Sequence, residues 1–454
     1  MTPILLTLSE HGSKTIEIRD EHPWELQAAA ARLCGQGICR KYAARNGDSA
    51  DQAALEFIAR RKDDAIEVKI DVSYFVGFDW IIPGMLGVRV QPKLDGEERR
   101  IDILKMLRQA LAERENFENL DGLLRLDFTQ PERMDEDDAE GLGLFIATAY
   151  LCVLSKIVRK GLQRNFYQRD ETFRRKIKGR VLFSPTVGGR RTPRISDRLS
   201  CTYQEFGVDV PANRVLKRAL RMVMRFLQTK AKAVEESAEL LEKARKLLQA
   251  FAPVSDERVA PAAVDSLSRA VNPLFRDYRQ ALRFAQKILR METLGSGETA
   301  HGGSIPVHWI NMPQLFELYV LAKLRKALRS NDRIRYQFGA NRQYPDFLCR
   351  ADADSCAAGV PAFFIADAKY KPRYADGNSG MVDDIRQLSG YARLAGVIEE
   401  FERWGWCEPN RVLPCVIVYS DQKIPSSDLD WARLEEIPRW MSFYKIGIRL
   451  PECR

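Results

Sequence analysis

Two short strings near the end of the chain constrain its fold more than any other feature of the sequence. They are Tyr344-Pro345-Asp346 and, further on, Ile365-Ala366-Asp367-Ala368-Lys369. The second string continues the apolar run that begins at Phe363, which is typical of a buried strand. Side chains two apart on a strand share a face, so the acid and the lysine of this string should project together. The segment between the two strings is long enough for a strand, a turn and a return strand, which predicts two acids on adjacent strands.

Two carboxylates and a lysine in this arrangement fit hydrolysis of a phosphodiester by water. Mg²⁺ prefers oxygen ligands and needs few protein carboxylates. Asp346 and Asp367 are therefore predicted to bind Mg²⁺, and the carbonyl of Ala368 could supply a third ligand. Lys369 could orient or help deprotonate the attacking water, while the metal ion neutralises charge on the phosphate. The pattern is that of the PD-(D/E)XK nucleases, which it resembles.

Flanking helices add further candidates. Glu317, on a helix predicted before the first string, could bind the metal or hold the ammonium of Lys369. Gln387 and Tyr391, on the helix predicted after the second string, are four apart and share a face. Each string alone has an ordinary structural explanation, since D-x-K triplets occur by chance and Pro-Asp is common in turns. Their order, with Glu317 before and Gln387 after, favours the nuclease.

Composition sets the class of protein. The chain has 454 residues, which predicts two or three domains, and its 45% hydrophobic and 29% charged residues are typical of soluble globular proteins. The net charge of +9 favours a polyanionic partner, although charge alone also allows a solvated basic surface. The same two explanations apply to the basic residues between Arg174 and Arg194. Nine unpatterned cysteines and four histidines give little support to a zinc site.

Nothing in the sequence indicates a membrane or an export signal. The N-terminus lacks the basic region and apolar core of a signal peptide. The longest apolar stretch, Leu142 to Ser155, is shorter than the roughly 20 residues that span a bilayer, so it predicts a buried helix. The cysteines are expected to be reduced, and the protein is expected in the cytoplasm without membrane contact.

Hydrophobic periodicity predicts the order of the elements. In the first half we expect a strand pair within 1–20, a helix over 22–60, strands over 65–90, a helix over 101–113, an exposed acidic loop at 130–141, a helix over 142–160 and a short strand at 180–183. In the second half we expect a helical hairpin starting at 213–251, a helix starting at Asn272-Pro273, a Gly/Ser-rich boundary at 294–304, a helix over 313–328, strands at 333–339, 344–349 and 362–368, a helix over 383–404 and a strand at 412–419.

Several strings between residues 70 and 420 resemble the McrC family. Those before residue 220 are Tyr74-Phe75-Val76-Gly77, Val88 to Leu94, Lys160-Gly161-Leu162, Lys178 to Val181, Cys201 to Phe206 and Asn213 to Lys217. The others are Leu315 to Val320 and Asp384 to Gln387 with Tyr391-Ala392, which flank the nuclease strings. The match is incomplete in two places. The first ~60 residues match no family string, and Gln204 stands where an acidic residue is usual.

The resemblance implies a specific role. McrC proteins are the endonuclease subunits of McrBC-type restriction systems, which cleave modified DNA. Their partner McrB is an AAA+ GTPase that forms hexameric rings and recognises the double-stranded DNA. The N-terminal part of McrC inserts into the pore of the ring and stimulates GTP hydrolysis, and the C-terminal part cuts. By motif, Asp346, Asp367 and Lys369 would form the catalytic core, supported by Glu317 and Gln387.

The sequence therefore predicts an α+β or α/β protein with three regions. Residues 1–200 would be a β-rich and helical domain that docks on the GTPase, and 201–300 a helical connection. Residues 301–454 would be the nuclease domain, with a mixed sheet flanked by helices. Two alternatives remain open: a non-catalytic activator that only docks on the ring, and a nucleic-acid-binding adaptor with a degenerate nuclease fold.

Overall fold

The structure is a computed structural model, and it describes most of the chain. The described residues are 3–44, 52–96, 100–111, 122–133, 136–182, 198–230, 235–256, 267, 276–295, 304–329, 333–340, 343–371, 381–406 and 412–453. Several helices and four sheets in these ranges give a mixed α+β fold. The class expected from the sequence is confirmed at that level.

The chain folds into two compact units whose boundaries differ from the three expected ranges. One unit comprises residues 1–141 and 302–454, and the other comprises 142–301. Residues 302–454 belong to the same unit as the N-terminal residues, although 301–454 was expected to be a separate domain. The reason is that strand β12 (Ser304–Asn311) pairs antiparallel with β6 (Phe75–Ile82). The expected limit at residue 200 lies inside β11 (Arg198–Gly207), which pairs along its whole length with β9 (Asn165–Arg174). Sheet pairing between distant segments is not encoded in local periodicity.

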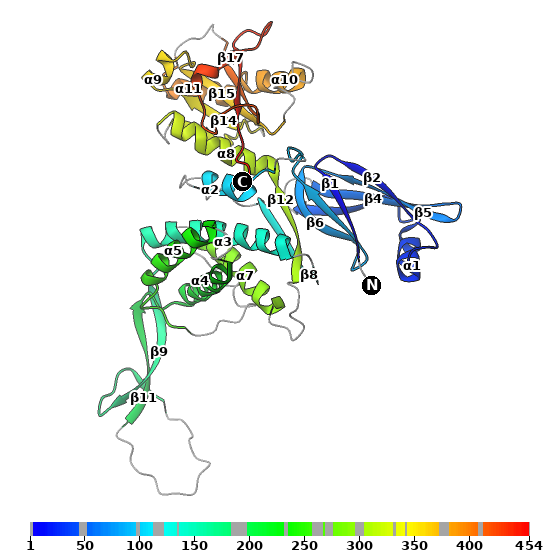
Figure 1. Cartoon of the computed structure of the whole chain (residues 1–454). Coiled ribbons are helices and arrows are strands. Elements are labelled where there is room, and N and C mark those ends of the chain that lie inside the picture. Colours follow the sequence, from blue (N-terminus) through cyan, green and yellow to red (C-terminus); the bar gives the residue numbers. More distant parts are fainter. Residues whose placement is uncertain are drawn as a thin grey trace. The chain divides into compact units, whose positions relative to one another are not determined.

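The N-terminal part of the first unit contains a four-stranded antiparallel sheet, drawn in blue in Figure 1. Its order is β2 (Ser13–Ile18), β5 (Ala65–Val72), β4 (Gln52–Lys62) and β3 (Cys39–Ala44). Helix α1 (Trp24–Leu33) packs against this sheet. Burial alternates along β5, and its buried residues Ile66, Val68, Ile70 and Val72 contribute to the core. Alternation with period two is the pattern of a sheet with one wet face.

A five-stranded sheet follows, built from both ends of the first unit. Its order is β1 (Ile4–Ser9), β7 (Leu86–Gln91), β6, β12 and β8 (Leu124–Arg133). The pairing of β12 with β6 is tight at Gly77, whose φ is 153°. A Cβ atom on Gly77 would lie 2.0 Å from the carbonyl oxygen of His308 on β12. Only glycine lets the two backbones approach so closely.

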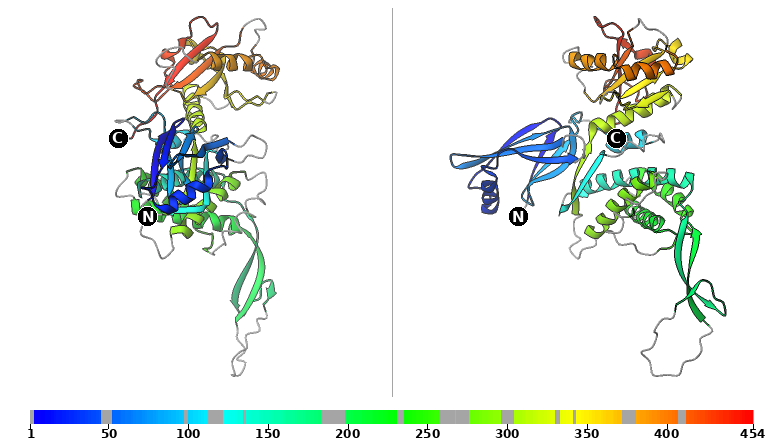
Figure 2. Two further views of the ribbon diagram at one scale, coloured as in Figure 1. Left: turned by 90° about the vertical axis from the view of Figure 1, so that its right-hand side faces the viewer. Right: turned by 180° about the vertical axis from the view of Figure 1, so that it is seen from behind.

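The second unit is helical and carries one long ribbon. Its helices are α3 (Glu136–Lys160), α4 (Pro211–Lys230), α5 (Glu235–Ala250) and α7 (Arg276–Gly295). Strands β9 and β11 form an antiparallel ribbon that extends beyond these helices, with the short β10 (Arg180–Val181) added at its edge (Figures 1 and 2). No residue of β9 is buried, so no core of this unit covers that strand.

The C-terminal part of the first unit forms a six-stranded mixed sheet with helices around it. In chain order the elements are α8 (Met312–Ala327), β13 (Ile334–Tyr336), β14 (Phe347–Arg350), α9 (Ala353–Ala357), β15 (Phe363–Lys369), α10 (Met381–Tyr391), α11 (Ala395–Arg403), β16 (Cys415–Ser420), the 3₁₀ turn Trp431–Arg433, β17 (Glu435–Glu436) and β18 (Phe443–Ile448). The strand order is β13-β14-β15-β16-β18-β17. Strand β15 is antiparallel to β14 and parallel to β16, which confirms the expected mixed sheet.

Local sequence explains how this sheet is framed. The side chain of Asn311 accepts a hydrogen bond from the backbone N–H of Gln314 at 3.0 Å, and Pro313 occupies the first turn, so helix α8 begins there. Apolar residues of α10 and α11 pack on the sheet: Ile385, Leu388, Val397 and Phe401 share a core with Ile365 and Ile417 of β15 and β16. Helix α2 (Ile103–Ala110), from the N-terminal half, contacts α8.

One helix among the described residues is long and apolar enough to cross a membrane by length and composition. It is Leu142–Lys160, within α3, and 78% of its most apolar window is buried inside the protein. A helix that is mostly buried in this way belongs to the core of the protein, and the sequence predicted a buried helix for this stretch.

Several element predictions are confirmed and others are wrong. Strands over 65–90 and helices over 101–113, 142–160 and 313–328 are present within a few residues. The two strands within 1–20 exist but belong to different sheets. The helix expected over 22–60 ends at Leu33, and β3 and β4 follow it. Part of the loop expected at 130–141 is the end of β8 and the start of α3, and the helix over 383–404 is two helices, α10 and α11. The helix start predicted at Asn272 lies outside the described residues, and so does most of the boundary predicted at 294–304.

Candidate active site

The two predicted acids lie beside each other at the ends of adjacent strands. Asp346 immediately precedes β14, and Asp367 lies in β15, where Phe347 of β14 pairs with Ala366. The backbone N–H of Ala368 donates a hydrogen bond to Oδ2 of Asp346 at 2.9 Å. This bond fixes the first carboxylate against the strand that carries the second. Asp367 is buried, with 2% of its surface exposed.

The lysine of the same strand faces Asp367, as alternation on a strand requires. Nζ of Lys369 lies 2.7 Å from Oδ2 of Asp367. It also donates a hydrogen bond to Oε1 of Gln387 at 3.1 Å, and Nε2 of Gln387 donates to the hydroxyl of Tyr391 at 2.7 Å. Helix α10 thus brings Gln387 and Tyr391 to the lysine. Apart from its ion pair, Oδ2 of Asp367 has no hydrogen-bond partner in the described part of the chain.

Glu317 reaches the same group of charges from α8. Its Oε2 accepts hydrogen bonds from the hydroxyl of Tyr336 at 3.0 Å and from Nε2 of Gln337 at 3.2 Å. The backbone N–H of Gln337 donates to the carbonyl oxygen of Asp346 at 2.8 Å. Gln337 has a φ of 46°, in the left-handed region that non-glycine residues seldom adopt. Gln337, which directly follows β13, therefore connects Glu317 to Asp346.

The acids of this group raise one another's pKa. Desolvation is the largest cause of the raised pKa of Asp346, followed by the charges of Asp367 and Glu317. Desolvation likewise dominates the raised pKa of Asp367 and of Glu317. For Lys369, burial lowers the pKa, but Asp367 and then Asp384 raise it more, so the net shift is upward. Lys369 is therefore an ammonium at neutral pH, surrounded by carboxylates whose charge it only partly compensates.

These features suit a divalent cation. Asp367 offers a buried carboxylate oxygen that only the Lys369 ammonium is described as approaching, at 2.7 Å, and Asp346 immediately precedes the neighbouring strand. Like charges crowded together raise each pKa, and a cation between them would relieve that repulsion. Within the described ranges no three acidic, histidine or cysteine side chains form a complete metal site. Mg²⁺ does not require one, because it commonly takes one or two protein carboxylates and completes its shell with water and phosphate oxygens.

Three residues at this site were missed by sequence reasoning. Tyr336 and Gln337 hold Glu317, but β13 is too short to give a signal. Asp384 of α10 is buried, with 6% of its surface exposed, and its Oδ1 lies 3.6 Å from Nζ of Lys369. The spacing of Asp384 to Gln387, three residues on one helix, was a usable signal, because such residues share a face.

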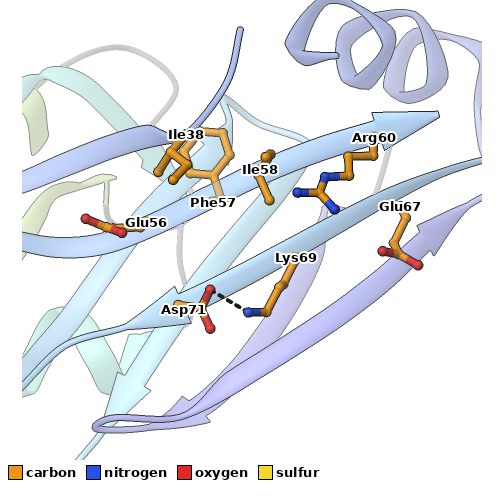
Figure 3. Close-up of a pocket in the computed structure, with 8 residues that line it drawn as sticks. All are labelled: Ile38, Glu56, Phe57, Ile58, Arg60, Glu67, Lys69 and Asp71. Atoms are coloured by element: carbon orange, nitrogen blue, oxygen red, sulfur yellow. Dashed lines mark ion pairs between the residues drawn. The ribbon is translucent and has the colours of Figure 1, made fainter. Parts of the chain in front are cut away.

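A separate pocket lies on the wet face of the four-stranded sheet. It has a volume of about 290 Å³. Figure 3 shows side chains of β4 and β5 along it, including the ion pair between Lys69 and Asp71, whose charged atoms are 3.2 Å apart. Its lining residues are Ile38, Glu56, Phe57, Ile58, Arg60, Glu67, Lys69 and Asp71. None of the candidate active-site residues contributes to it.

A family model decides where this chain belongs. Residues 75–397 match the family described as the McrBC 5-methylcytosine restriction system component. The chain belongs to this family. The matched range contains all five candidate residues, and the resemblance inferred from the sequence is confirmed at the level of the family. Residues 1–74, which include α1 and β1 to β5, precede the range that the family model matches.

Solved structures of family complexes are among those similar to this chain. One is a half-complex from a tetradecameric assembly of Thermococcus gammatolerans McrB AAA+ hexamers with bound McrC. It is 19% identical, with 98% of this chain and 94% of that chain covered and a TM-score of 0.41. The other is a cryo-EM structure of the Thermococcus gammatolerans McrBC complex. It is 17% identical, with 73% of this chain and 90% of that chain covered and a TM-score of 0.30. Comparison with curated proteins gave no match.

Proposed function

We propose that this chain is the endonuclease subunit of an McrBC-like restriction system and hydrolyses phosphodiester bonds of DNA with Mg²⁺. The observation that carries this proposal is the arrangement around β15. Asp346 is held to β15 by the N–H of Ala368, and Asp367 and Lys369 lie together on that strand. The mixed sheet with flanking helices agrees with the PD-(D/E)XK nuclease fold that the motif suggested. Membership of the restriction family supports DNA as the substrate.

Each residue of the site has a physical task in this proposal. Asp346 and Asp367 would hold Mg²⁺, with the carbonyl of Ala368 as a further ligand. When bound, Mg²⁺ would neutralise phosphate charge and acidify water. Lys369, as an ammonium, would donate a hydrogen bond to the attacking water or to a phosphate oxygen. Gln387 orients that ammonium at 3.1 Å. Glu317 would add negative charge that strengthens cation binding.

The β9–β11 ribbon is the part of the chain best suited to enter a ring. The ribbon extends beyond the helices of its unit, and its β9 strand has no buried residue (Figure 2). Phe166 and Phe206 are 65% and 57% exposed and pack on each other, with ring centroids 5.1 Å apart. Arg174 and Arg180 are also exposed on the strands of this ribbon. We propose that the ribbon docks in the pore of a hexameric AAA+ GTPase partner, as the McrC resemblance implies, and stimulates GTP hydrolysis.

A cleavage assay tests the nuclease. The purified chain, its AAA+ partner from the same genome, GTP and methylated plasmid DNA are combined with Mg²⁺. We expect cleavage that EDTA abolishes and that added Mg²⁺ restores. Lys69→Ala, in the separate pocket, serves as the control and should cleave as the wild type does.

Two results would favour the alternatives. A chain that raises the GTPase rate of the partner but never cuts DNA would be an activator. A chain that binds DNA but neither binds a divalent cation nor cuts would be an adaptor with a nuclease-like fold. Calcium titration separates these outcomes, because Ca²⁺ takes carboxylate oxygens as ligands and its binding is measured without turnover.

A further inference from the structure

Asp384 is a buried carboxylate between two lysines. Its Oδ1 lies 3.6 Å from Nζ of Lys369 and 3.2 Å from Nζ of Lys371, and its Oδ2 lies 3.3 Å from Nζ of Lys371. The neighbouring Asp383 on the same helix has an 89% exposed side chain and pairs only at the surface, with Arg386. Burial of a charge is costly unless it is paired, so Asp384 has a specific environment and Asp383 does not.

Lys369 lies between two carboxylates, those of Asp367 and Asp384, which differ in the other contacts that they make. Oδ2 of Asp367 is buried and lies 2.7 Å from the ammonium, and Asp367 is also one of the two acids proposed to hold the cation. Asp384 is farther from the ammonium and comes from helix α10, which also supplies Gln387. A cation on Asp367 would compete with Lys369 for the same oxygen. The ammonium would then rely on Asp384 and Gln387 to stay at the site.

We propose that Asp384 is a positioning residue that retains the Lys369 ammonium on the α10 side when Asp367 binds a divalent cation. The inference rests on the proposed nuclease function and adds a residue to it. In this proposal Asp384 acts through Lys369, with which it pairs, and is not itself a ligand of the metal ion. It makes cation binding easier, because it offers the ammonium a second carboxylate, and it keeps the ammonium within reach of the reacting water.

A double-mutant cycle on Ca²⁺ binding tests this without any turnover. Isothermal titration of the full chain compares wild type, Asp384→Asn, Lys369→Met and the double variant. We expect Asp384→Asn to weaken Ca²⁺ binding ~10-fold, because Lys369 then pairs only with Asp367, as for partners that support metal ligands. With Met at position 369 the same change should cost less than about 3-fold, since the coupling needs the ammonium. An equal loss in both backgrounds would overturn the inference.

Cleavage kinetics give the second measurement. Asp384→Asn should lower kcat by ~10- to 100-fold and leave KM for DNA unchanged, since positioning and not DNA binding is lost. Asp383→Asn is the matched control and should behave as wild type. If Asp384 served only to hold Lys371 and helix α10, Lys371→Met would lower kcat equally, and that result would also overturn the inference. Lys371 is 38% exposed, so its replacement is expected to fold.

The failure of this inference can be told from failure of the proposed function. Asp367→Ala is measured in parallel. If Asp367→Ala is inactive while Asp384→Asn matches Asp383→Asn in both measurements, only the role of Asp384 is wrong. If Asp367→Ala cleaves as the wild type does, the proposed nuclease site itself is wrong.

Discussion

Single acidic side chains in this protein differ in how their charge is compensated. Asp384 pairs with Lys369 and Lys371, whereas the ion pair of Asp367 is with Lys369. Glu10, at the end of β1, shows a third case. It is 4% exposed, and its Oε2 accepts a hydrogen bond from the backbone N–H of Lys93 at 2.9 Å. Burial raises its pKa to about 7, although Lys93 and Tyr370 lower it.

The protonation of Glu10 predicts a pH dependence of stability. Its pKa rises from 4.5 to about 7 on folding, so the folded state binds the proton more tightly. The stabilisation is complete below pH 4.5 and is lost as the pH rises through 7, by about 3 kcal/mol in total. Glu10→Gln lacks this proton equilibrium. We expect the melting temperature of wild type to fall more between pH 5 and pH 8 than that of Glu10→Gln.

Calorimetry at several pH values checks this prediction. The groups that bear on Glu10 are Lys93, Tyr370 and Asp95, and none of them changes in the variant. Glu17→Gln, on the exposed surface of β2, is the control. Parallel curves for wild type and Glu10→Gln would mean that Glu10 is ionised in the folded protein throughout this range.

Individual elements show what local sequence can and cannot determine. The buried strand β15 was predictable from its apolar run, and alternation then placed Asp367 and Lys369 on one face. The prediction of a helix over 22–60 was wrong beyond Leu33. The later part of that range forms β4, which pairs with β5 from Leu55 to Lys62. That pairing buries Leu55, Phe57 and Ala59, and tertiary burial overrides helix propensity. Asp384 was missed although its spacing to Gln387 was a usable signal, because its lysine partners lie on or just after another element, β15.

The close approach of β12 to Gly77 of β6 predicts the effect of a substitution on stability. The pairing of β6 with β12 joins the two chain segments of the first unit, and a methyl group at position 77 would collide with the His308 carbonyl. Gly77→Ala should lower the free energy of unfolding by roughly 3 kcal/mol or more, since the backbone must shift and φ is unfavourable for alanine. Chemical denaturation measures the loss.

An open glycine provides the comparison. Among the described residues a Cβ atom on Gly96 would meet nothing within 4 Å, and the φ of Gly96 lies outside the left-handed region, so Gly96→Ala should change stability by less than about 0.5 kcal/mol. Equal stability of the two alanine variants would show that the close approach at Gly77 is absent in solution.

At the scale of the whole molecule, cleavage and partner docking are assigned to different units. The acids and Lys369 lie in the unit of residues 1–141 and 302–454, and the β9–β11 ribbon lies in the other. The two units differ from the three ranges expected from the sequence, because β12 returns to the N-terminal sheet. The separation implies that each function can be removed without the other.

The exposed aromatic pair of the ribbon tests this separation. Phe166→Ser with Phe206→Ser removes two side chains that are mostly exposed, so the melting temperature should change little. Stimulation of the partner GTPase should fall at least ~10-fold, because exposed aromatic residues are frequent anchors of interfaces. Ca²⁺ binding should be unchanged. Thr172→Ala, on the same ribbon, is the control, and normal stimulation by the double variant would exclude the pair from docking.

The central claim is that Asp367 belongs to a metal-dependent nuclease site, and cleavage by Asp367→Ala tests it most directly. The variant is assayed with the AAA+ partner, GTP, Mg²⁺ and methylated DNA beside wild type. We expect cleavage to fall by at least ~100-fold, as for loss of a residue required for positioning and charge stabilisation, while GTPase stimulation stays at the wild-type level. Cleavage by Asp367→Ala at the wild-type rate would contradict the account.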